Sequence, residues 1–119
     1  MTLNEAINRI DSVMPNAYTD EEKIDWISRL DAMVLKQVYD KYNDTEEFVP
    51  YGADRDIELL VPYPFDSIYI DWLKTQIALA ENETANYNNF AMVFNDSFAE
   101  FRNYYNSTHM PKGSHIKYW

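Results

Sequence analysis

The stretch from Phe65 to Glu81, FDSIYIDWLKTQIALAE, constrains the fold of this chain more than any other segment. On a helix, at about 100° per residue, its apolar side chains cover most of the circumference and leave only a narrow polar strip. Such a helix has to be covered from several directions, which is the position of a central helix in a bundle. We therefore expect the rest of the chain to pack around it, with Ile68, Trp72 and Leu79 in the core.

Three further segments have the apolar spacing of amphipathic helices, and two of them begin with a capping box, Thr2 with Glu5 and Thr19 with Glu22. The sequence thus predicts an all-α fold, a small bundle of about four helices near residues 3–13, 20–39, 66–81 and 84–107, in a single domain over residues 1–110. The apolar stripes of the second and fourth of these helices complete the expected core, which also contains Ile27, Leu30, Val34, Tyr87, Phe90, Phe94, Phe98 and Phe101.

Helical spacing is lost between residues 43 and 64, where Pro50, Gly52, Pro62 and Pro64 interrupt the chain. An irregular loop this long is unusual in so small a domain and more often serves a function or is ordered by a partner. Its pieces EFVPY and ELLVPY could form short extended strands, which the prolines would confine to sheet edges.

Composition excludes several classes of protein. The 119 residues contain no cysteine, so disulfides, thiolate-bound metals and thiol nucleophiles are excluded. No apolar run approaches the roughly 20 residues that span a bilayer, and the start of the chain lacks the pattern of a signal peptide. We therefore expect a protein of the cytosol that does not contact membranes.

The net charge of −10 disfavours general binding to nucleic acid, whose phosphates it repels. The charge is also uneven, because the loop region is acidic whereas Arg102, Lys112 and Lys117 follow Glu100 with no further acid. This asymmetry could dock copies of the chain head to tail. An acidic surface that only keeps the protein in solution explains the charge equally well.

No residues in this sequence predict catalysis, a cofactor or a metal site. His109 and His115 are the only histidines, and neither belongs to a metal-binding spacing. Gly52 and Gly113 are the only glycines, so no glycine-rich phosphate loop exists. We expect the chain not to be an enzyme.

Two helices carry features that predict contacts with other copies. Trp26 and Met33 lie seven residues apart, opposite the apolar stripe of their helix, which predicts either an interface or a cover formed by the first helix or the long loop. The fourth helix has a polar face made largely of asparagine, a poor helix former, as expected for a surface partly covered in an assembly. A solvated face is the alternative. The asparagine candidates for this interface are Asn88, Asn89, Asn95 and Asn103.

Residues 111–119 form a C-terminal arm in this interpretation. The cluster of Ile116, Tyr118 and Trp119 is costly to leave in water. It predicts an arm that docks on a neighbouring subunit, with a disordered end as the alternative.

Residues 1–111 resemble the head-tail connector, or adaptor, proteins of long-tailed phages and prophages of Gram-positive bacteria, small helical proteins encoded just after the major capsid gene. The most specific pieces are LLVPYPFDSIYIDWL, ANYNNFAMVFN and FRNYYNSTHMP, none of which is a catalytic motif. The resemblance implies a structural virion protein that forms a homo-oligomeric ring between the portal protein and tail-completion proteins. It also implies a place in the host bacterial cytoplasm during assembly and then at the head-tail junction, where DNA passes as a non-specifically contacted polymer.

The residues alone are also compatible with a second class of function. An acidic helical regulatory or inhibitor protein, acting by protein–protein binding, would have the same composition and the same lack of catalytic groups. Self-association is the property that separates the two classes.

Overall fold

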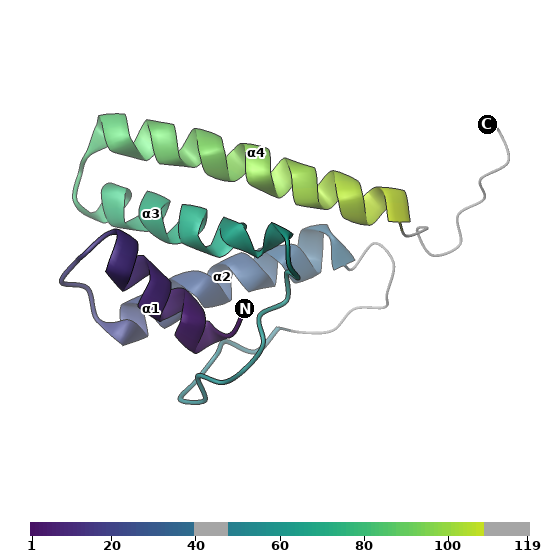
Figure 1. The fold of residues 1–119 in the computed structure, drawn as a ribbon, viewed down its shortest axis with the longest axis horizontal. Coiled ribbons are helices and arrows are strands. Elements are labelled where there is room, and N and C mark those ends of the chain that lie inside the picture. The colour runs from purple at the N-terminus through teal and green to yellow at the C-terminus, as the bar shows by residue number, and fades with distance from the viewer. Residues whose placement is uncertain (40–47, 109–119) are drawn as a thin grey trace, which may run out of the picture.

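The structure, a computed structural model, describes residues 1–39 and 48–108, and these residues form an all-α bundle of four helices (Figure 1). The helices are α1 (Leu3–Val13), α2 (Asp20–Gln37), α3 (Ile68–Ala80) and α4 (Thr84–Thr108), and one 3-10 turn, η2 (Phe65–Ser67), leads into α3. Every helix begins and ends within about two residues of its predicted bounds. In the described part of the long loop, the expected strands are reduced to a single β-bridge between Thr2 and Glu58.

Both predicted capping boxes are present and fix the starts of α1 and α2. The Thr2 hydroxyl accepts the Glu5 amide at 3.1 Å while the Glu5 carboxylate accepts the Thr2 amide at 2.8 Å. Thr19 and Glu22 repeat this exchange, with both distances at 3.1 Å. These bonds satisfy amides that have no partner inside the helix.

A tight turn joins α3 to α4 and makes them antiparallel. Asn82 adopts a left-handed backbone with φ of 57°. The amide of Glu83 bonds the Ala78 carbonyl at 3.0 Å, and the amide of Asn82 bonds the Leu79 carbonyl at 3.2 Å. This is the Schellman pattern of a helix end, with asparagine in the place that glycine usually takes.

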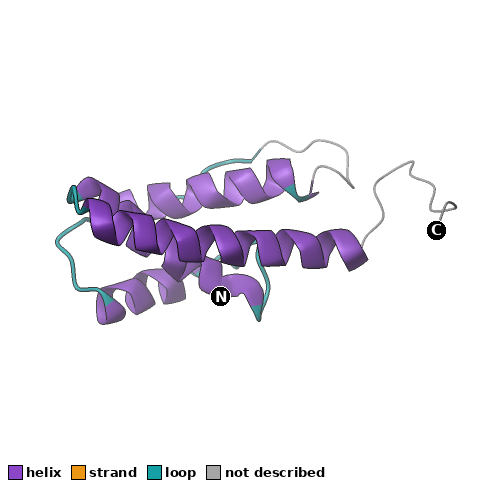
Figure 2. Cartoon of the chain, turned by 90° about the horizontal axis from the view of Figure 1, so that it is seen from above, coloured by secondary structure: helices purple, strands orange, loops and turns teal. Residues whose placement is uncertain are grey.

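The central position predicted for α3 is confirmed. It contacts α1, α2 and α4, whereas α4 contacts only α3 and η2 among the described elements. Figure 1 shows α4 along one side of α3 and the other two helices on the opposite side, and Figure 2 shows the same bundle from above. Helix α4 is therefore the least covered member of the bundle.

The C-terminal half of α4 extends beyond α3 and packs on aromatic side chains from other segments. Phe101 lies 6.3 Å from the ring of Tyr39, which follows α2, and Phe65 of η2 lies 4.7 Å from Tyr104. Burial raises the pKa of Tyr39 to about 12, and its hydroxyl donates to the Leu60 carbonyl at 2.8 Å. These contacts tie the end of α4 to the long loop.

Most of the predicted core is confirmed by burial. The confirmed side chains are Ile27, Leu30, Val34, Ile68, Phe94, Phe98 and Phe101. Leu59 and Val61 of the long loop are also buried, and they lie two residues apart in the piece ELLVPY, which the sequence indicated as a possible extended strand.

Four predicted core residues need correction. Leu79 is 53% exposed, and Trp72, Tyr87 and Phe90 are only half-buried. Trp72 lines the open space between α2 and α4, whereas Leu79 lies near the end of α3 and lines a separate hollow beside the turn into α4. Tyr87 and Phe90 lie in the first turns of α4, where α3 is the only helix that covers them.

A buried carboxylate fastens the long loop to the bundle. Asp31 of α2 accepts hydrogen bonds from the Tyr51 hydroxyl at 2.5 Å, the Tyr69 hydroxyl at 2.6 Å and the Leu60 amide at 3.2 Å. The Tyr69 hydroxyl in turn accepts the Val61 amide at 2.8 Å. Burial raises the pKa of Asp31, and the three donors oppose that shift. Two helices and the loop thus meet at one side chain.

Candidate interaction surface

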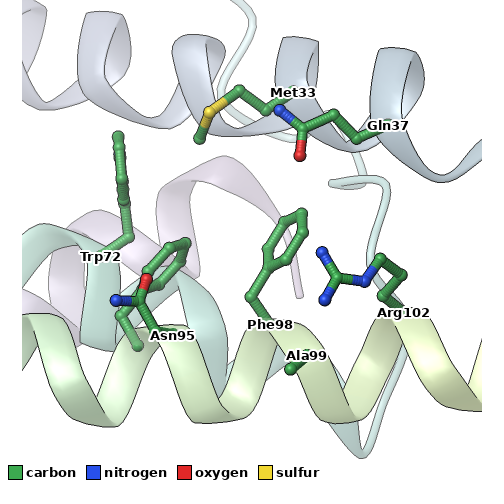
Figure 3. A pocket seen from close by; sticks show the side chains of 8 residues that line it. Met33, Gln37, Trp72, Asn95, Phe98, Ala99 and Arg102 are labelled. Atoms are coloured by element: carbon green, nitrogen blue, oxygen red, sulfur yellow. The ribbon is translucent and has the colours of Figure 1, made fainter.

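A groove runs between α2 and α4 with α3 beneath it, and Figure 3 shows its lining. Its volume is about 450 Å³, within the range of small ligand pockets. Trp72 of α3 and Phe94 and Phe98 of α4 form an apolar floor. Met33 of α2 faces Trp72 and Phe98 across the opening (Figure 3). The groove exists because α2 and α4 both pack on α3 without contacting each other.

Trp72 holds the α2 side of this groove in place. Its indole N–H donates to the Trp26 carbonyl at 2.7 Å, and its ring lies 5.0 Å from that of Phe94. The bond links α3 to the middle of α2 with a donor that would otherwise be buried without a partner. Trp72 therefore connects α3 to both α2 and α4 at the groove, and it does not lie at the centre of the core.

For Trp26 and Met33 the sequence left two alternatives, an interface or a cover from within the chain, and the structure shows both residues partly covered. Both are half-buried and pack against the core. Tyr18, in the loop between α1 and α2, covers Trp26 edge-on with ring centroids 5.5 Å apart. Met33 lines the groove, so Trp26 is partly covered within the chain and Met33 remains an interface candidate.

Polar side chains border the apolar floor on the α4 side. The Arg102 guanidinium lies 5.9 Å from the centre of the Phe98 ring, in cation–π position. None of the acidic groups in the described residues forms an ion pair with Arg102. Asn95 on α4 and Gln37 on α2 add amide donors and acceptors on opposite sides of the groove.

The outer face of α4 is the second exposed feature. Met92 is 63% exposed and Val93 is 51% exposed, although both belong to a long regular helix. The whole helix has three charged residues among 25, whereas α2 has eight among 18. Asn88, Asn89, Asn95 and Asn103 are all exposed, as the sequence predicts for this face.

The two apolar residues of this face, Met92 and Val93, were not singled out from the sequence. They lie outside the aromatic stripe of α4 at about 100° per residue, which is the signal that could have identified them. The predicted arm residues Ile116, Tyr118 and Trp119 lie outside the described residues. The predicted interface therefore divides into one covered residue, a groove, and an amide-rich helix face.

Among the described residues, the surroundings of Asp31 do not form a catalytic site. A buried acid with a raised pKa is typical of active sites, but both Asp31 oxygens are occupied by donors from the fold itself. Residues 1–39 and 48–108 hold no cluster of three or more metal-ligating side chains. Nor does any helix within these two ranges combine the length and apolar character that a membrane crossing requires.

No protein-family model, curated protein or solved structure matches this chain.

Proposed function

We propose that this chain is a structural subunit that joins copies of itself into a ring at the head-tail junction of a long-tailed phage or prophage. In this role it lies between the portal protein and the tail-completion proteins and extends the channel for DNA. The subunit is made in the host bacterial cytoplasm and ends in the virion. The observation that carries the proposal is the outer face of α4.

That face has the composition of a surface intended for burial against protein. Exposed aliphatic side chains at Met92 and Val93 are flanked by amides that can bond across an interface, and few charges need to be desolvated. An ordinary solvated helix of this chain, such as α2, is rich in charge instead. Since asparagine lowers helix propensity, its repeated use on α4 favours a role in contact.

The shape and charge of the subunit are compatible with a ring. A closed ring requires two different complementary patches on each subunit, and the exposed outer face of α4 supplies one of them. An acidic subunit lets DNA pass without adhering to the channel, since counterion release gives no affinity to a surface of like charge.

The test is self-association measured by light scattering over a series of protein concentrations. We expect oligomers at high concentration, and we expect Val93→Asp to shift their formation to at least about tenfold higher concentration, since it buries a charge at the interface. Val49→Asp is the matched control, because Val49 is 77% exposed but lies in the loop. Equal effects of the two substitutions would contradict the role of α4.

The genes next to the coding sequence provide an independent test of the proposed function. Portal or capsid genes beside the coding sequence support the proposal even if a nucleating portal is needed for assembly. A chain that is monomeric at every concentration and has no such neighbours would overturn it. A stable complex with one unrelated protein would then favour the acidic regulatory class.

A further inference from the structure

The groove between α2 and α4 and the opposite side of α4 have complementary chemistry. We propose that the groove of one subunit receives the side of α4 that carries Val93 and Glu100 from a second copy, with that Glu100 paired to Arg102. This side is the η2 flank of α4, because Glu100 lies beside η2. The inference rests on the proposed function, since it names the two surfaces that meet around the ring.

The groove combines an apolar surface with one cation that lacks a carboxylate partner. Trp72, Phe94 and Phe98 form its floor, and its volume of about 450 Å³ leaves room for side chains of another molecule. Arg102 is half-buried at its border, 5.9 Å from the centre of the Phe98 ring (Figure 3). A guanidinium that rests on a ring, with no acid paired to it among residues 1–39 and 48–108, suits a carboxylate from a second molecule.

The η2 flank has the matching features. Val93 and Glu100 are both exposed, and Glu100 lines a small hollow with Pro64 and Phe65 on the side of α4 away from the groove. None of the described basic groups forms an ion pair with Glu100. The flank thus presents an apolar side chain and an unpaired acid, whereas the groove presents an apolar floor and an unpaired base.

The spacing along α4 allows both contacts at once. Val93 and Glu100 are seven residues apart, and so are Asn95 and Arg102 on the groove side, which is about two turns or about 10.5 Å. The second pair is displaced from the first by two residues, about 3 Å along the axis and about 160° around it. Two parallel α4 helices can therefore set Glu100 against Arg102 and Val93 against the groove.

Such a contact repeats from copy to copy. The groove and the η2 flank lie on opposite sides of α4, so a subunit that places its flank in one neighbour keeps its own groove free for the next. Rotation about an axis roughly parallel to α4 keeps these helices parallel, as the spacing requires. A contact between two identical faces would instead end at a dimer.

The test uses the full chain with one surface blocked at a time. Arg102→Glu sets two acids against each other at the groove, and Val93→Asp brings a charge to the apolar floor from the flank. Circular dichroism establishes that both variants are folded. By light scattering we expect each variant alone to associate only at concentrations at least about tenfold above those of the wild type, because like charges meet or a charge is buried at the contact.

An equimolar mixture of the two variants is the decisive measurement. It contains one intact pairing, between the groove of the Val93→Asp chain and the flank of the Arg102→Glu chain. We expect one-to-one complexes and nothing larger at a concentration where each variant alone is monomeric. The absence of complexes from the mixture would overturn the proposal, as two identical faces in contact would give that result.

A charge exchange identifies the ion pair. Arg102→Glu combined with Glu100→Lys should restore association to within about threefold of the wild type, since the pair is reversed and not removed. The matched control combines Arg102→Glu with Asp96→Lys, which makes the same change in net charge at an exposed acid one turn earlier on α4. Equal recovery in both double variants would contradict the pairing of Glu100 with Arg102.

Failure of this inference is distinguishable from failure of the proposed function. Oligomers that Val93→Asp dissolves and Arg102→Glu leaves intact would overturn the pairing while the ring stands. A wild-type chain that is monomeric at every concentration would also overturn the pairing, whereas the proposed function would then be decided by the neighbouring genes.

Discussion

Replacing Tyr69 with phenylalanine tests the hydrogen bonds that tie the loop to the bundle. The Tyr69 hydroxyl donates to Asp31 at 2.6 Å and accepts the Val61 amide at 2.8 Å. The ring is completely buried, and phenylalanine keeps its shape, so packing changes little. The substitution removes only the oxygen that joins α3 to α2 and to the loop.

The expected magnitude follows from the two bonds. A hydrogen bond to a charged group contributes about 1.5–3 kcal/mol, and a buried amide left without a partner costs about 1–3 kcal/mol. Because one hydroxyl carries both effects, we expect Tyr69→Phe to lower the free energy of unfolding by about 3 kcal/mol at pH 7. Tyr51→Phe, which removes one donor from a half-buried ring, should cost about half as much.

The assay is urea denaturation followed by far-UV circular dichroism, repeated across pH. Burial raises the pKa of Asp31 in the folded chain, and loss of the Tyr69 donor raises it further. An acid whose pKa is higher in the folded state costs stability as pH rises through the interval between its unfolded and folded values. The difference between wild type and Tyr69→Phe should therefore grow as pH rises above the folded-state pKa of Asp31 in the wild type, which burial raises above its ordinary value.

A loss below about 1 kcal/mol would refute this reasoning, because it would mean that the orphaned amide and carboxylate find other partners at no cost. So would a loss for Tyr51→Phe that equals or exceeds that for Tyr69→Phe. A difference that shrinks with rising pH would show that Asp31 is not the group responsible.

Five further substitutions, at four positions, are checked by the same denaturation assay. Trp72→Ala should cost about 2 kcal/mol and Phe101→Ala about 4 kcal/mol, since the first side chain is half-buried and the second fully buried; the reverse order would contradict the groove. Asn82→Ala should cost about 1 kcal/mol, whereas Asn82→Gly should cost nothing, because glycine and asparagine tolerate a φ of 57° and alanine does not. Thr19→Ala should cost about 1 kcal/mol through the lost cap, and an unchanged stability would show that the capping box is redundant.

Local sequence patterns were sufficient to predict the positions of the helices. The capping boxes at Thr2 and Thr19 and the aromatic stripe of α4 are determined by residues three or four positions apart, so they can be read from the chain alone. The burial of Phe94, Phe98 and Phe101 follows from the same periodicity. Here the fold class is a direct consequence of spacing.

Features that depend on how whole helices pack against one another could not be predicted from local sequence patterns. Nothing in the periodicity of α3 indicates that α2 and α4 leave a gap above Trp72, because that gap depends on how both helices pack on α3. Burial of Asp31 depends on two tyrosines that lie 20 and 38 positions away along the chain. Sequence spacing carries no information about such distant partners.

Helix α4 contacts α3, η2 and the ring of Tyr39, whereas α3 is embedded among three helices. Thermal fluctuations can therefore release α4 while Asp31 and its donors stay assembled, so the amides of α4 should exchange their hydrogens by sub-global opening at a lower free energy than those of α3. A helix that detaches at low free-energy cost can also change its angle when it binds another protein. The subunit thus has a rigid centre at α3 and a more adaptable helix, α4, at its edge.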